Sequence, residues 1–292
     1  MSAFARTKIG GLSVSRMIIG SNWFLGWSHC TAAKDKFIKE HIAERKKIAD
    51  ILEVFLDYGV DTIMGQIQYP KFLEAIQEAQ DRTGKKMIII STPSIPIGPE
   101  TLTKGFDKKA LAAILDKEVE MGASICMPHQ QTTDALVDRC IRKIRKMEPL
   151  CQMIRSRGMI PGLSTHMPET IVYADESGLD VETYVSIFNT AGFLMTVEVD
   201  WVARLIQQAD KPVLAIKPMA AGQIRPLQGL TFVWNTIRTQ DMVVVGVMTP
   251  DEAKEDIEIS LGLLEKRDIK ITLQETRSKS SIKSKKLKEF YH

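Results

Sequence analysis

The sequence has 292 residues, of which 44% are hydrophobic and 26% are charged, so the chain can bury one large core or two ordinary ones. Its formal net charge of +3 is concentrated at the end, because residues 277–292 hold six basic side chains and one acidic side chain. The rest of the chain holds 33 basic and 35 acidic residues, which excludes a broad nucleic-acid-binding face.

The location of the protein is predicted from what the sequence lacks. No apolar run reaches the roughly 18 residues of a membrane span, and no signal peptide precedes the first folded segment. The four cysteines lie far apart and form no CxxC pair. We therefore expect a cytoplasmic, reduced protein that does not associate with a membrane.

Short apolar runs and amphipathic stretches alternate along the chain. The runs, each short enough for a strand buried on both faces, span 16–20, 60–64, 86–91, 123–127, 159–164, 184–189, 213–217 and 242–246. Between them, Ile48, Leu52 and Phe55 keep helical spacing, and so does the stretch 137–147. The stretch 21–41 reads as a long loop, and Thr249-Pro-Asp-Glu predicts the start of the last helix.

Eight strand–helix units predict a parallel sheet that closes into a (β/α)₈ barrel. No break in composition indicates a second domain, so residues 1–292 are expected to form one domain with its core at about 10–265. The basic extension 266–292 is expected to be a solvated end, a helix across the barrel bottom or a contact for an acidic partner. An open doubly wound sheet is the alternative, but GSNWFLGW after the first strand is a poor GxGxxG.

Active sites of such barrels form where the strands end. Three of the five histidines (His29, His129 and His166) follow predicted strands, as do Tyr69 and Lys217. Aromatic residues nearby favour a pocket for a small-molecule ligand. Neutral imidazoles from three loops are also compatible with Zn²⁺ or a similar ion, although their spacing matches no known metal motif.

Several stretches resemble one known family. They are ARTKIGGLSVSRMIIG, DYGVDTIMGQIQY, GASICMPHQ, GLSTHMPETI, KPVLAIKPMAAGQI and VVVGVMTPDEAKEDIE, spread over about residues 5–265. Together they resemble the aldo/keto reductases. The resemblance implies a barrel preceded by an N-terminal hairpin, and an oxidoreductase that acts on a small carbonyl or sugar-like substrate.

The resemblance assigns catalytic roles to four positions. Tyr69 matches the tyrosine that donates a proton to the carbonyl, and His129 matches the histidine that orients the substrate. The aspartate and the lysine that lower the pKa of that tyrosine fall on Met64 and near Pro93. The ion pair of the family is therefore missing, and Lys217 is a candidate for its replacement, or for a base or a Schiff-base amine.

The cofactor positions are mixed in the same way. Those implied to contact NAD or NADP are Ser164, Thr165, Asn189, Ile216, Met248 and Thr249. The basic residues that bind the NADP 2′-phosphate have no counterpart, and Glu252 stands where an arginine is usual. Three functions stay open: an oxidoreductase, a non-redox lyase, isomerase or hydrolase that uses the three histidines with or without a metal, and an inactive ligand-binding relative.

Overall fold

Eight parallel strands form the central barrel of the structure, a computed structural model that describes residues 3–42, 44–269, 271–274 and 276–281. In chain order they are β3 (Met17–Gly20), β4 (Thr62–Gly65), β5 (Ile88–Ser91), β6 (Ala123–Cys126), β9 (Ile160–Pro161), β10 (Tyr184–Ile187), β11 (Val213–Ile216) and β12 (Met242–Val245). Pairing runs from β10 through β11, β12, β3, β4, β5 and β6 to β9. A parallel bridge between Leu163 and Tyr184 joins the two ends, which confirms the predicted (β/α)₈ barrel.

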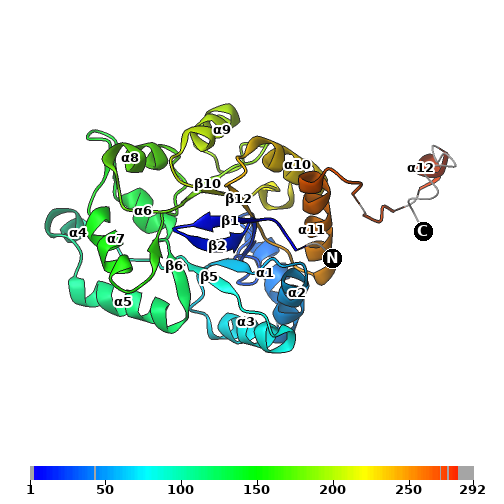
Figure 1. The fold of residues 1–292 in the computed structure, drawn as a ribbon, viewed down its shortest axis with the longest axis horizontal. Helices are drawn as coiled ribbons and strands as arrows, with labels where there is room; N and C mark the ends of the chain where they lie inside the picture. Colours follow the sequence, from blue (N-terminus) through cyan, green and yellow to red (C-terminus); the bar gives the residue numbers. More distant parts are fainter. Residues whose placement is uncertain (1–2, 43, 270, 275, 282–292) are drawn as a thin grey trace.

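Helices surround the sheet (Figure 1). They are α1 (Ala32–His41), α2 (Arg45–Asp57), α3 (Pro70–Thr83), α4 (Pro99–Lys104), α5 (Lys108–Glu120), α6 (Gln130–Ala135), α7 (Met147–Arg155), α8 (Glu169–Ser177), α9 (Val199–Gln208), the 3₁₀ turn η1 (Ala220–Gly222), α10 (Pro226–Thr236), α11 (Pro250–Glu265) and α12 (Arg277–Ser281). Helix α2 buries Ile48, Leu52 and Phe55, as their spacing predicts. The side chain of Thr249 caps α11 by accepting a hydrogen bond from the Glu252 amide, as expected.

An N-terminal hairpin closes one end of the barrel. Its strands, β1 (Arg6–Ile9) and β2 (Leu12–Ser15), pair antiparallel, and Figure 1 shows the hairpin across the middle of the ring. Ile9 and Val14 are fully buried and pack with apolar side chains of the barrel strands. The hairpin therefore contributes core as well as a cover, and it confirms the expectation from the resemblance.

Two predictions for local structure were wrong. The stretch 21–41 contains α1, whose start is capped by Thr31. The stretch 137–147 is a small hairpin, β7 (Val137–Asp138) with β8 (Lys143–Ile144), and not a helix. The carboxylate of Asp138 accepts hydrogen bonds from the amides of Cys140 and Ile141, at 3.0 and 3.3 Å, which stabilises a turn in place of a helix.

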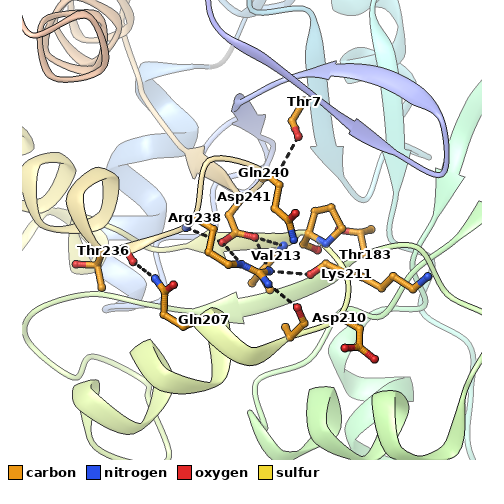
Figure 2. Close-up of polar contacts among 12 residues, drawn as sticks. Thr7, Thr183, Gln207, Asp210, Lys211, Val213, Thr236, Arg238, Gln240 and Asp241 are labelled. Atoms are coloured by element: carbon orange, nitrogen blue, oxygen red, sulfur yellow. Dashed lines mark hydrogen bonds and ion pairs between the residues drawn. The ribbon is translucent and has the colours of Figure 1, made fainter.

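A largely buried ion pair lies where the strands β11 and β12 begin (Figure 2). Asp241, at 0% exposure, precedes β12 and accepts two hydrogen bonds from the Arg238 guanidinium, at 2.8 and 2.9 Å. The same carboxylate accepts from the amide of Val213, the first residue of β11, at 2.9 Å. This pair ties the β12 entry to the neighbouring strand.

The last part of the chain is described only in part. Helix α12 follows the barrel, and the basic residues Lys283, Lys285, Lys286 and Lys288 lie outside the described residues. In the described part of the chain, no helix combines the length and the apolar character needed to cross a bilayer.

Candidate functional site

A cavity of about 990 Å³ lies at the ends of the barrel strands. The segments that follow β3, β4, β5, β6, β9, β11 and β12 all contribute to its lining. This is the face where parallel-barrel enzymes carry their active sites. The cavity is therefore the candidate active site.

One lysine and three histidines come together in this cavity. Lys217 follows β11, His29 follows β3, His129 is the N-cap of α6 after β6, and His166 follows β9. Four separate strand ends thus supply four basic groups. The structure brings together all three histidines proposed from the sequence, with Lys217 beside them.

Burial and mutual repulsion keep the imidazoles uncharged. Burial, followed by the positive charge of Lys217, lowers the pKa of His29 to about 4 and that of His166 to about 3. The same two causes lower the pKa of His129. Burial alone lowers the pKa of Lys217 to about 8. At neutral pH the cluster holds one ammonium group among three neutral rings.

Hydrogen bonds hold the histidines in place. The Asn22 Nδ2 and His29 Nε2 atoms lie 2.8 Å apart. The Nδ1 atom of His129 accepts from the amide of Gln131 at 3.4 Å. The amide of His166 donates to Asp134 Oδ2 at 3.1 Å. The site is thus built on α6 and on loops anchored at the strand ends.

Lys217 has an unusual backbone conformation. Its φ of 59° lies in the left-handed region, which is uncommon for a residue with a side chain. Its carbonyl oxygen accepts from the amide of Ala220 at 2.9 Å, which helps to fix the turn. Strained residues of this kind are concentrated at functional sites, so the conformation supports a role for this side chain.

Tyr69 lies outside the cavity. It is the N-cap residue of α3, its side chain is 39% exposed, and it is absent from the lining. Its ring packs edge-on against Trp27, with 5.7 Å between the centroids, and Trp27 itself lines the cavity. The residue that the resemblance implies as proton donor is thus in contact with a cavity-lining tryptophan but is not itself part of the lining.

The positions of the missing ion pair are occupied differently. Met64 lines the cavity, and the carbonyl oxygen of Pro93 accepts from the amide of His129 at 2.9 Å. Next to Met64, Gly65 packs so closely on Ser21 that an added Cβ would lie 1.7 Å from Ser21 Oγ. That hydroxyl is buried and has no hydrogen-bond partner among the described residues.

Only two of the six residues proposed for a nicotinamide cofactor line the cavity, Ser164 and Ile216. Thr165 is buried, and its hydroxyl donates to Asp134 at 2.5 Å. Asn189 is buried and bonded to the backbone of Phe193. The remaining two, Met248 and Thr249, form the entry to α11 and are not part of the lining.

The cavity has an acidic part, and of its residues only Glu252 was a candidate from the sequence. Glu252, Glu255 and Asp256 line it from the first two turns of α11. Asp256 is 2% exposed, and burial together with its two acidic neighbours raises its pKa. The i, i+3, i+4 spacing of these acids, which places them on one helix face, is the signal that was missed.

The start of α11 is occupied by its own side chain. Glu252 Oε2 accepts from the amide of Met248 at 2.7 Å, while Thr249 Oγ1 accepts from the amide of Glu252 at 3.1 Å. A helix N-terminus is a favourable place for an anion, and here Glu252 supplies it. The site thus does not fit the 2′-phosphate of NADP.

The residues fit NAD(H) better. Carboxylates accept hydrogen bonds from ribose hydroxyls and amino groups, so the acidic part suits an adenosine without a 2′-phosphate. Of the residues that the resemblance assigns to the cofactor, Ser164 and Ile216 line the same cavity. A metal has no such support, because no group of three His, Cys, Asp or Glu side chains within the described ranges is arranged to hold an ion.

Comparisons with known proteins support the fold. No family model and no curated protein match the sequence. Solved structures do match: a protein of Pseudomonas aeruginosa assigned to the aldo-keto reductases shares 15% identity, with a TM-score of 0.64 over 90% of this chain and 97% of that one. An aldo-keto reductase from a Medee basin deep-sea metagenome library shares 11% identity, with a TM-score of 0.56 over 93% and 98%. An aldose reductase from Giardia lamblia shares 11% identity, with a TM-score of 0.51 over 87% and 93%. The chain therefore has an aldo/keto reductase-like fold.

Proposed function

We propose that this protein is an aldo/keto reductase-like oxidoreductase that reduces the carbonyl group of a small substrate, with Lys217 as proton donor and NADH as hydride source. The observation that carries the proposal is the ammonium group of Lys217, which lines the cavity at a strand end beside three histidines. Among the described residues it has no ion-pair or hydrogen-bond partner, so its charge is available to a substrate. The aldo/keto reductase-like fold adds support.

Carbonyl reduction develops negative charge on the oxygen, which a buried cation stabilises. With a pKa of about 8, Lys217 is mostly protonated at pH 7 and still releases its proton readily. It would donate that proton to the oxygen and take another from solvent. The neutral histidines His29, His129 and His166 would orient the carbonyl group by hydrogen bonds without adding charge.

NADH, when bound, supplies the hydride that this chain's side chains lack. Ser164 and Ile216 would contact its nicotinamide part, and Glu252, Glu255 and Asp256 its adenosine part. An additional phosphate near Glu252 would be repelled by about 1 kcal/mol or more. We therefore expect a preference for NADH over NADPH.

The proton donor is the point at which this proposal departs from the resemblance. Tyr69 is the residue that matches the family, but it lies outside the cavity lining and packs edge-on against Trp27. A general acid must come within hydrogen-bond distance of the group that it protonates. Lys217 meets this requirement better, because it lines the same cavity as the histidines.

A second candidate function is favoured by the position of Lys217 in the cavity lining and by its lowered pKa, because an amine that is partly unprotonated near neutral pH can act as a nucleophile. In a lyase or isomerase, this amine would add to a carbonyl, release water and form an iminium ion. Borohydride reduces such an ion to a stable secondary amine. A covalent adduct at Lys217, found by mass spectrometry without NADH, would favour this function over hydride transfer.

The experiment that tests the oxidoreductase is a fluorescence titration with NADH and NADPH, followed by turnover of a panel of aldehydes and ketones. We expect NADH to bind more tightly and Lys217→Met to abolish turnover. Lys254→Met is the matched control, because Lys254 is exposed on α11 and does not line the cavity. Failure of both cofactors to bind would refute the proposal, and binding without turnover would favour an inactive ligand-binding relative.

A further inference from the structure

The cationic part of the cavity lacks a counter-charge. Lys217 lines the cavity, and in the part of the chain that the structure describes no carboxylate lies within ion-pair distance of its Nζ atom. Lys217 is half-buried, and a charge partly removed from water without a partner is unfavourable unless a ligand neutralises it. A ligand of this site is therefore expected to carry a negative charge.

The acidic side chains of the cavity are not available for this purpose. Asp35 accepts from both the amide and the hydroxyl of Ser28, at 2.8 and 2.6 Å. Glu252 is bonded to the amide of Met248. Glu255 and Asp256 repel one another on α11, and neither acts on Lys217, whose pKa responds to burial alone. The positive charge stays uncompensated within the protein.

The surroundings of Lys217 indicate the size of the missing charge. The rings of His29, His129 and His166 are neutral near pH 7. The charged side chains that line this part of the cavity are Lys217, Arg225 and Asp35, so its net charge is +1. A carboxylate neutralises one charge, whereas a phosphate group brings more than one and would leave the excess buried. A single carboxylate matches best.

An ammonium group has three donors, and it can therefore serve two neighbouring oxygen atoms. We propose that the substrate is a 2-oxo acid, whose carboxylate oxygen and carbonyl oxygen both accept hydrogen bonds from Lys217. This inference rests on the proposed function, since it names the substrate class for the same site. The net change is then 2-oxo acid plus NADH plus one proton to 2-hydroxy acid plus NAD⁺, with the proton reaching the oxygen from Lys217.

The first test compares a carboxylate with its methyl ester, which removes the negative charge and adds one methyl group. Pyruvate and methyl pyruvate carry the same carbonyl group, but only pyruvate carries a carboxylate. In NADH-dependent turnover by the unmodified protein, we expect kcat/KM to be at least a hundredfold higher for pyruvate. Equal values would overturn the inference, because the carboxylate would then contribute nothing.

The second test uses oxamate, which carries one carboxylate beside an amide carbonyl and is not reduced, in calorimetry of the protein without NADH. Of the groups that line the cavity near Lys217, the three imidazoles are neutral and Asp35 is charged throughout pH 7 to 9.5, and Arg225 is the other cation. Asp256 lines the cavity with a raised pKa, and Lys217→Arg, which retains this acid, shows any contribution from it separately. The ammonium form of Lys217 is needed, so oxamate affinity should fall about tenfold per pH unit above about pH 8.

Two variants separate the charge from the fold. Lys217→Arg keeps a permanent charge, so its oxamate affinity should not change over this pH range. Lys217→Met should lose oxamate binding at every pH, with an unchanged melting temperature as evidence of folding. A pH-independent affinity in the unmodified protein would overturn the inference. Oxamate binding with the expected pH profile but without any NADH turnover would refute the oxidoreductase and keep the anion site, whereas turnover of neutral aldehydes without oxamate binding would do the reverse.

Discussion

The buried pair of Arg238 and Asp241 makes a strong prediction about stability. In Asp241→Ala, the Arg238 guanidinium loses both of its bonds to the carboxylate, and the amides of Arg238 and Val213 lose their acceptor (Figure 2). Breaking a buried pair by removing one partner costs about 3–5 kcal/mol, because the other charge is left without compensation. This is a large share of the roughly 5–15 kcal/mol that stabilises a typical domain.

The measurement is urea denaturation followed by circular dichroism. The free energies of unfolding are compared between variants for which the free energy depends on the urea concentration with the same slope. The control is Glu100→Ala, which removes an exposed i, i+4 pair with Lys104. Exposed pairs contribute about 0–1 kcal/mol, so this variant should resemble the wild type. A loss below about 1 kcal/mol for Asp241→Ala would refute the reasoning, since it would mean that water compensates Arg238.

Three further predictions follow from the site. In Tyr69→Phe, steady-state kinetics should give a kcat within about threefold of the wild-type value, because the side chain lies outside the cavity lining. A hundredfold loss of kcat would identify Tyr69 as the proton donor. Gly65→Ala would place its Cβ 1.7 Å from Ser21 Oγ at a φ of +151°. Urea denaturation should show that this variant loses about 1–3 kcal/mol more free energy of unfolding than the control Gly84→Ala, whose added Cβ meets open space. Equal losses in the two variants would contradict the clash. The pKa of His166 is about 3 in the folded chain and 6.5 in the unfolded chain, so the unfolded state binds more protons between these pH values. The free energy of unfolding should therefore fall as the pH falls through this range, by up to about 1.4 kcal/mol per pH unit. Denaturation of His166→Gln at several pH values should show a smaller dependence on pH, and an unchanged dependence would exclude His166 as the cause.

The barrel could be predicted because each of its strands is a continuous apolar run, a pattern that depends only on burial. The stretch 137–147 could not, since the same spacing of apolar residues is compatible with a helix. The carboxylate of Asp138 decided the outcome by bonding to the turn that follows it. A side-chain contact of this kind is not visible in hydrophobic periodicity.

The same distinction applies to the candidate site. His29, His129, His166 and Lys217 follow strand ends directly, so the barrel geometry alone places them at one mouth. The position of Tyr69 depends on how the loop after β3 packs, because Trp27 of that loop lines the cavity and packs edge-on against the Tyr69 ring. Loop packing of this kind could not be predicted from the spacing of residues along the chain.

The contact of Glu252 with the start of α11 has a consequence for how this barrel could change its cofactor. The carboxylate is tethered four residues from the amide of Met248, so it acts as a ligand that is always present, at an effective concentration of millimolar or higher. A phosphate arriving from solution competes with this tethered group for the same amide. Adding a new basic side chain near α11 would raise the attraction for phosphate without removing its competitor. A change to NADP would therefore begin with the loss of Glu252, and an added cation would become useful only after that.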